Sequence, residues 1–464
     1  MTLLALSVAQ LGRGLRTGAF TAEDVTRAAL DRIAALDGAV HAFIRVEEEA
    51  AIAAARQVDA ELRAGHDRGL LHGIPYATKD IYNVAGLPTT CHSRLRLDHV
   101  AAADAAVTAR LREGGAVLLG KLATFEFALG GTSFDLPFPP ARNPWNLTHI
   151  PGGSSSGSAA AVAAGYLRVA TASCTSGSIR GPAAWCGVAG LKPSFGRVSR
   201  RGVFPLSWTM DHCGPIARSV EDAAIALQVM AGHDPLDPGS INRPVPDYTV
   251  GLERGVRGLH IGVPRDFFED LPSMTADARA GIAGTLARLR SEGAVVRDVA
   301  LPDLARFIAC SRVIMAAESF AIHRRDLARH LDDYGEVAAG RFIQGAGISA
   351  ADYLDAQRLR GSLAAAVDAA LRENNVLVTA ISLATAPSFR SQLGPVSWPL
   401  QASPFNVSGH PALSVPIGLG CDGLPLAVQI VGRPFDEAGV LRVGRAIERM
   451  SGWDLLPLPK VPAP

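Results

Sequence analysis

The chain alternates between hydrophobic positions at helical spacing and short runs of consecutive hydrophobic residues. After Thr21, hydrophobic residues recur every four positions at Val25, Ala29 and Ile33, and an acid follows three residues after Thr21, which predicts a capped helix. Helices are predicted over 21–36, 47–64 and 107–113, and strands over 41–46, 116–120, 259–263, 376–379 and 426–431. Strands that alternate with helices predict an α/β protein whose sheet is covered by helices on both faces.

Residues from about 265 to 372 form a different kind of segment, rich in Ala, Arg and Leu, with a helical period and no clear strand. No linker rich in Pro, Gly or Ser separates this segment from the rest, and the chain shows no internal repeat. We therefore predict one α/β domain over 1–464. Its sheet core is expected over about 66–240 and 373–450, with the helical segment packed on that core.

Composition narrows the functional classes. Hydrophobic residues make up 48% of the chain and charged residues 19%, which excludes a disordered or coiled-coil protein. The net charge of +1 offers no excess of cations for phosphates, so a nucleic-acid partner is not expected. Six cysteines without a CxxC pair argue against a zinc site and favour reduced thiols in the cytoplasm. We expect no signal peptide and no membrane span.

A stretch rich in glycine and serine, residues 151–158, precedes an alanine-rich run. It lacks the Gly-Lys-Ser/Thr ending of a phosphate loop. Residues 153–157 match the G-x-S-x-G nucleophile elbow, which would make Ser155 the nucleophile, although residues 146–151 are a poor strand to precede such a turn. A third interpretation is a serine-rich helix start without chemistry.

Two further segments carry candidate chemistry. Lys79 ends an apolar run, and burial of a lysine lowers its pKa, which can make the amine a base. Ser178 follows small residues, where backbone N–H groups could point at an oxyanion.

These residues stand in motifs that resemble the amidase signature family over nearly the whole chain. The motifs are G-I-P-x-x-x-K-D ending at Asp80, Gly-Gly-Ser-Ser at 152–155, Gly-Ser-Ile-Arg at 177–180, G-L-K-P-S-x-G-R within 187–201, and segments 86–90, 142–145, 211–215, 405–416 and 423–429. Their joint presence in this order makes the resemblance specific. It implies a large, mixed, twisted sheet covered by helices, with the segment 265–372 lining the pocket.

The resemblance also implies a proton relay for amide hydrolysis. Ser178 would be the nucleophile, Ser154 a bridging serine and Lys79 the base, at intervals of 75 and 24 residues. Family members hold the bridging serine through a cis peptide, here Gly153–Ser154. The implied oxyanion hole consists of the backbone N–H groups of Thr175, Ser176, Gly177 and Ser178, and the implied supporting residues are Gly153, Ser155 and Arg180.

Other interpretations of these residues stay open. Lys79 could be a surface lysine beside Asp80, and Asp211 is expected to be structural. The family usually has Asp where this chain has Cys174 and Gly where it has Ser176, so the oxyanion hole is the least secure inference. A positive φ at Ser176 would cost about 1–2 kcal/mol. His323 and His330 share a helix face, but without a third ligand they do not predict a metal site.

We expect a stand-alone amidase without cofactor or metal, acting on a small neutral amide, anilide or carbamate (urethane). The alternatives are the glutaminase subunit of an amidotransferase, which needs a partner complex, and a ureide hydrolase. Gly181 disfavours the glutaminase, because amidotransferase subunits usually have Gln there. The pocket should be mostly apolar. Family members are often homodimers, so a second copy of the chain is the expected protein partner.

Overall fold

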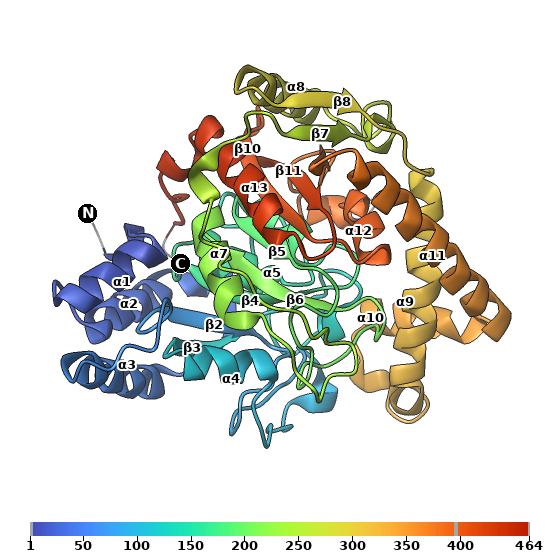
Figure 1. The fold of residues 1–464 in the computed structure, drawn as a ribbon. Coiled ribbons are helices and arrows are strands. Elements are labelled where there is room, and N and C mark those ends of the chain that lie inside the picture. Colours follow the sequence, from blue (N-terminus) through green and yellow to red (C-terminus); the bar gives the residue numbers. More distant parts are fainter. Residues whose placement is uncertain (1–2, 394–397, 463–464) are drawn as a thin grey trace.

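An eleven-stranded sheet crosses the molecule in this computed structural model, which describes residues 3–393 and 398–462 (Figure 1). The strand order is β1-β3-β2-β4-β6-β5-β10-β11-β9-β7-β8. The strands are β1 (Phe43–Val46), β2 (Pro75–Lys79), β3 (Val117–Leu122), β4 (Val169–Cys174), β5 (Ala189–Lys192), β6 (His212–Ala217), β7 (His260–Val263), β8 (Val295–Asp298), β9 (Val376–Ala380), β10 (Ala412–Leu419) and β11 (Pro425–Gly432). Strand β2 pairs in parallel with β3 and β4, and β7 pairs in parallel with β8 and β9. The other pairs are antiparallel, so the sheet is mixed, as expected.

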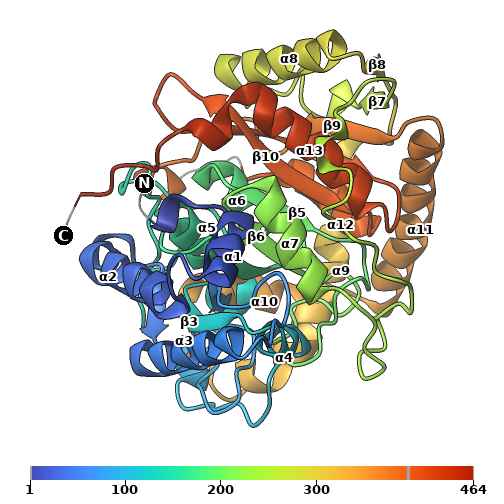
Figure 2. The same cartoon turned by 60° about the vertical axis from the view of Figure 1, so that its left-hand side comes forward.

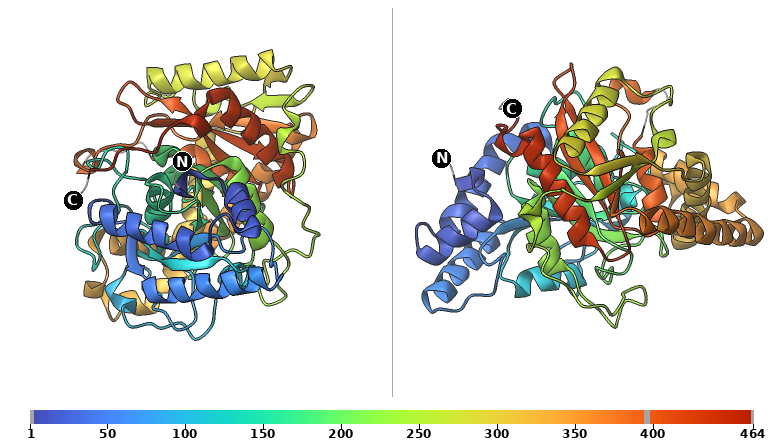
Figure 3. Two further views of the ribbon diagram at one scale, coloured as in Figure 1. Left: turned by 90° about the vertical axis from the view of Figure 1, so that its left-hand side faces the viewer. Right: turned by 45° about the horizontal axis from the view of Figure 1, so that its top comes forward.

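Helices cover both faces of this sheet. They are α1 (Val8–Thr17), α2 (Ala22–Val40), α3 (Glu48–Arg63), α4 (Ala106–Glu113), α5 (Ser156–Ala163), α6 (Arg180–Cys186), α7 (Val220–Met230), α8 (Ala276–Ser291), α9 (Leu304–Leu327), α10 (Glu336–Ile343), α11 (Ala350–Arg372), α12 (Ser403–Val407) and α13 (Glu437–Ser451). Helices α7 and α13 pack on β6 and β10 and lie in front of the sheet in Figure 2. Helices α5 and α6 pack on β4 and β5, and Figure 3 shows α8 beside the β7–β8 edge.

The helices and strands predicted from periodicity are confirmed, with shifts of a few residues at their ends. Thr21 caps α2 through a capping box, because its hydroxyl accepts from the backbone N–H of Asp24 while the Asp24 side chain accepts from Thr21. Among the described residues, no helix is both long and apolar enough to cross a membrane.

The segment 265–372 is not wholly helical, which corrects the expectation from its pattern. It contains β8, which pairs with β7 at the edge of the sheet. The strand has only 4 residues and none of them is buried, so it lacks the apolar run that marks the central strands. The rest of the segment is mainly α8–α11, and α9 and α10 contribute residues to the cavity described below.

Two parallel strands, β2 and β4, bring candidate catalytic residues to one edge of the sheet. Strands β2 and β4 are hydrogen-bonded neighbours, and Tyr76 of β2 lies opposite Val169 of β4. Because parallel strands end at the same edge, Lys79 at the end of β2 lies beside the end of β4. The Lys79 side chain is therefore placed beside Ser173, near the end of β4.

Helix α5 can fit against these strands because its residues are small. All of its residues are buried, and five of the eight are alanine or glycine. A Cβ on Gly157 would lie 2.4 Å from the carbonyl oxygen of Ala42 and 2.5 Å from the backbone nitrogen of Ala123. Because both contacts are with backbone atoms, this position requires glycine.

We predict that Gly157→Ala lowers the free energy of unfolding by about 1–3 kcal/mol, because the added methyl group overpacks α5 against backbone. Gly284→Ala, a matched helical control in α8 with open space around its Cβ, should raise stability by about 0.5–1 kcal/mol. Urea unfolding of both variants measures this contrast. Equal stabilities would show that the α5 contact can relax.

Candidate active site

Lys79 is completely buried, with 0% of its surface exposed. Its Nζ donates to the Oγ of Ser154 at 2.8 Å and to the Oγ of Ser173 at 2.9 Å. Asp80 does not pair with this amine, because its carboxylate lies 2.9 Å from the Nζ of Lys121. The interpretation of Lys79 as a surface lysine is therefore wrong.

Burial also sets the charge of this amine. Desolvation lowers the pKa of Lys79 to about 7, and electrostatic interactions with Cys174 and Asp211 only partly oppose the shift. A substantial fraction of the amine is neutral near pH 7. A neutral amine at 2.8 Å from a hydroxyl can accept its proton.

The peptide bond Gly153–Ser154 is cis, as the family resemblance implied. Ser155 is fully buried, as Ser154 nearly is, and its Oγ donates to the Ser173 carbonyl at 3.3 Å. Its backbone N–H donates to the Ser178 carbonyl at 3.3 Å. Ser155 thus ties two loops together, and its burial does not fit the exposed serine of a nucleophile elbow.

Ser154 and Ser178 line one cavity of about 560 Å³, which we name the Ser178 cavity. Its wall is mostly apolar and includes Phe125, Trp185, Leu206, Ile308, Met315 and Trp398. Ser178 lies in the loop between β4 and α6. Within the described chain, the backbone N–H groups of residues 175–178 donate no hydrogen bond, so they remain available to an oxygen in the cavity.

The buried Arg180 connects this loop to neighbouring elements through side-chain hydrogen bonds. The Arg180 guanidinium donates to the side-chain oxygens of Gln429 and Asn406, and it lies 3.5 Å from the Sγ of Cys174. Among the described residues, Arg180 forms no ion pair with a carboxylate. Burial alone would raise the pKa of Cys174, but the guanidinium outweighs it and holds that pKa below its usual value.

Ser176 fits the loop without strain. It is not among the residues with positive φ, and Gly177 at φ +138° adopts that conformation instead. The Ser176 Oγ lies 2.6 Å from the Oγ of Ser403 and 3.3 Å from the Oγ of Ser311. These three hydroxyls connect the loop to α12 and α9 and line the Ser178 cavity.

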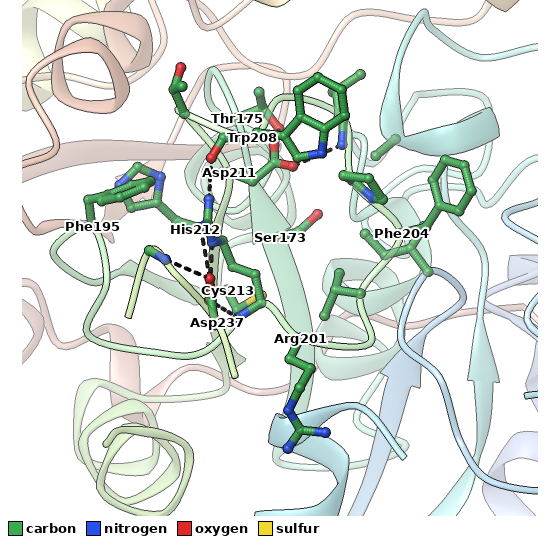
Figure 4. A pocket seen from close by; sticks show the side chains of 18 of the residues that line it. Ser173, Thr175, Phe195, Arg201, Phe204, Trp208, Asp211, His212, Cys213 and Asp237 are labelled. Carbon is green, nitrogen blue, oxygen red and sulfur yellow. Dashed lines mark hydrogen bonds and ion pairs between the residues drawn. The ribbon is translucent and has the colours of Figure 1, made fainter. Parts of the chain in front are cut away.

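A second cavity of about 600 Å³, the Asp211 cavity, adjoins the first and shares Ala128, Thr175 and Leu206 with it. Figure 4 shows its wall, with Ser173 between the Asp211 and Phe204 sides. The Thr175 hydroxyl donates to Asp211 at 2.6 Å, and two backbone N–H groups also donate to that carboxylate. Burial raises the Asp211 pKa. Asp211 thus anchors the loop, as its expected structural role requires.

Sequence reasoning missed several residues of this site. Ser173 binds Lys79 but looks like any small residue of a buried strand. Arg312 and Arg341 line the Ser178 cavity, yet nothing in an arginine-rich helical pattern separates them from surface arginines. No group of His, Cys, Asp and Glu among the described residues could hold a metal ion. His323 stacks on Phe342 and bonds the Tyr334 hydroxyl instead.

Known proteins match this chain over nearly its whole length. A family model described as Amidase matches residues 24–441. A glutamyl-tRNA(Gln) amidotransferase subunit from Anaeromyxobacter sp. (strain K) is 38% identical over 491 aligned residues, covering 100% of this chain and 99% of the relative.

Solved structures match over almost the whole chain. One belongs to a vestigial protein complex described as revealing the origins of an s-triazine catabolic enzyme. It is 35% identical with a TM-score of 0.91, covering 99% of this chain and 100% of the other. A bacterial aryl acylamidase of the amidase signature family is 27% identical with a TM-score of 0.89, covering 97% of both chains.

We predict that a carboxylate placed beside Arg180 stabilises the fold. Cys174→Asp should give a higher free energy of unfolding than the size-matched, uncharged Cys174→Asn, by about 1.5–3 kcal/mol, because it supplies a carboxylate to a buried guanidinium. Chemical denaturation at pH 7.5 measures the difference. Equal values would mean that the neutral acceptors of Gln429 and Asn406 already satisfy Arg180.

Proposed function

The chain belongs to the amidase signature family and is an amidohydrolase acting on C–N bonds, and we propose that it cleaves a small amide through an acyl-enzyme on Ser178. The observation that carries this proposal is the buried Lys79 amine, 2.8 Å from the Ser154 hydroxyl, with Ser154 and Ser178 in one cavity. A serine hydroxyl needs a base to become a nucleophile, and in this proposal Lys79 acts on Ser178 through the Ser154 hydroxyl.

In the proposed acylation, neutral Lys79 accepts the Ser154 proton while Ser154 accepts the proton of Ser178. The Ser178 Oγ attacks the carbonyl carbon, and the free N–H groups of the 175–178 loop stabilise the oxyanion. The proton then returns through Ser154 to the leaving nitrogen as the C–N bond breaks. Water repeats the sequence on the ester and releases the carboxylic acid, so no cofactor is required.

A stand-alone amidase is the first candidate, with an amide, an anilide or a carbamate as the substrate. The mostly apolar wall of the Ser178 cavity supports a small organic amide. The glutaminase subunit of an amidotransferase is the second candidate, supported by 38% identity over the full length of such a protein. The replacements at Cys174, Ser176 and Gly181 favour the first candidate.

We predict that the purified chain alone hydrolyses small amides and that Ser178→Ala lowers kcat by about 10,000-fold or more, because the nucleophile is lost. Ser154→Ala should retain a slow residual rate, since Lys79 is then separated from Ser178. Mass spectrometry of rapidly quenched reactions should find the acyl group on Ser178. An acyl group on Ser155, with Ser178→Ala active, would overturn the assignment.

We predict that activity follows the deprotonation of Lys79. Below its pKa of about 7 the ammonium form cannot accept a proton, so kcat/KM should fall about tenfold per pH unit there and level off at higher pH. The measurement is a pH profile from 5.5 to 9.5 with an uncharged substrate whose acylation limits the rate. A flat profile over this range would contradict the role of Lys79 as the base.

A further inference from the structure

Two arginines on the wall of the Ser178 cavity have no partner in the described chain. Arg312 on α9 and Arg341 on α10 line this cavity, and both are exposed, which places them where the cavity meets solvent. Neither forms a hydrogen bond or an ion pair within residues 3–393 and 398–462. Helices α9 and α10 pack together, and both arginines line the same cavity of about 560 Å³.

The charged side chains on the wall of the Ser178 cavity are all positive among the described residues. Among the described lining residues, no Asp or Glu accompanies Arg312 and Arg341. The nearest carboxylate to the catalytic loop, Asp211, lines the other cavity and already accepts from Thr175 and from two backbone N–H groups. A cation on the substrate would therefore meet two positive charges and no anion, whereas an anion would meet two free guanidinium groups.

From this arrangement, and resting on the proposed amidase activity, we propose that the substrate is an amide whose remainder carries an anionic group, such as a carboxylate, and no ammonium group. Arg312 and Arg341 bind the anion, while the amide carbon lies at Ser178. Arginine suits this role because its planar fork donates two parallel hydrogen bonds to a carboxylate. The substrate is thus anionic rather than the neutral amide expected from sequence.

The same charge arrangement separates this chain from a glutaminase. Glutamine carries a carboxylate that the two arginines can bind, but it also carries an α-ammonium group. Desolvating that group beside two guanidinium groups without an acidic partner is unfavourable. Glutaramate is glutamine without this ammonium group, so the pair of compounds isolates its effect.

Three matched amides test the proposal. They are glutaramate, L-glutamine, and 5-oxohexanamide, which has an uncharged methyl ketone in place of the glutaramate carboxylate. We expect wild-type kcat/KM for glutaramate to exceed that for each of the other two by about tenfold or more, the usual worth of a charge-assisted hydrogen bond.

The variants Arg312→Gln and Arg341→Gln should each raise KM for glutaramate about tenfold and should change KM for 5-oxohexanamide several-fold less. Arg325→Gln is the matched control, because Arg325 is also exposed on α9 but does not line the cavity. It should change neither substrate's kinetics.

Calorimetry with Ser178→Ala protein tests the same subsite without turnover. Glutaramate should bind, and adding Arg312→Gln or Arg341→Gln should weaken that binding about tenfold. Hydrolysis of 5-oxohexanamide as efficient as that of glutaramate would overturn the proposal while leaving the amidase activity intact, and a preference for L-glutamine would also overturn it. If glutaramate binds through the arginines but no amide is cleaved, the amidase proposal fails and the anion subsite stands.

Discussion

The site depends on one constraint, the burial of the Lys79 amine among hydroxyl groups. In water this amine would be an ammonium ion at neutral pH, and only its removal from solvent brings its pKa to about 7. The two serine hydroxyls within 2.9 Å replace part of its hydration without supplying a negative charge. A carboxylate at either position would favour the ammonium form and remove the proposed base, and the carboxylate of Asp80 pairs with Lys121 instead.

A second constraint falls on the loop that carries Ser178. Its backbone N–H groups stay unpaired within the described chain, so side chains around it must hold its shape. Arg180 does so from the side of β11 and α12, and Asp211 does so through Thr175. The replacement of the usual Asp by Cys174 therefore leaves the loop with several anchors. Ser176 adds a hydroxyl contact to α12 in place of a glycine.

Substrate selection is separate from this chemistry. The proposed relay comes from β2, the loop before α5 and the loop after β4, whereas Arg312 and Arg341 come from helices α9 and α10. In this proposal, changes in α9 and α10 can alter the substrate without altering the relay. A full-length similarity to an amidotransferase protein thus supports the shared chemistry more strongly than a shared substrate.

The sequence alone determined the α/β pattern and the capped helix after Thr21, because local periodicity carries these features. The candidate residues of the relay came from the family resemblance of its motifs. The cis bond at Gly153–Ser154 was anticipated through the family resemblance. Tertiary structure alone decided the contact of Ser173 with Lys79, the edge strand β8 and the positions of Arg312 and Arg341. These features depend on which distant segments meet: a short, half-exposed strand has no apolar run, and an arginine on a cavity wall has the same local pattern as one in solvent.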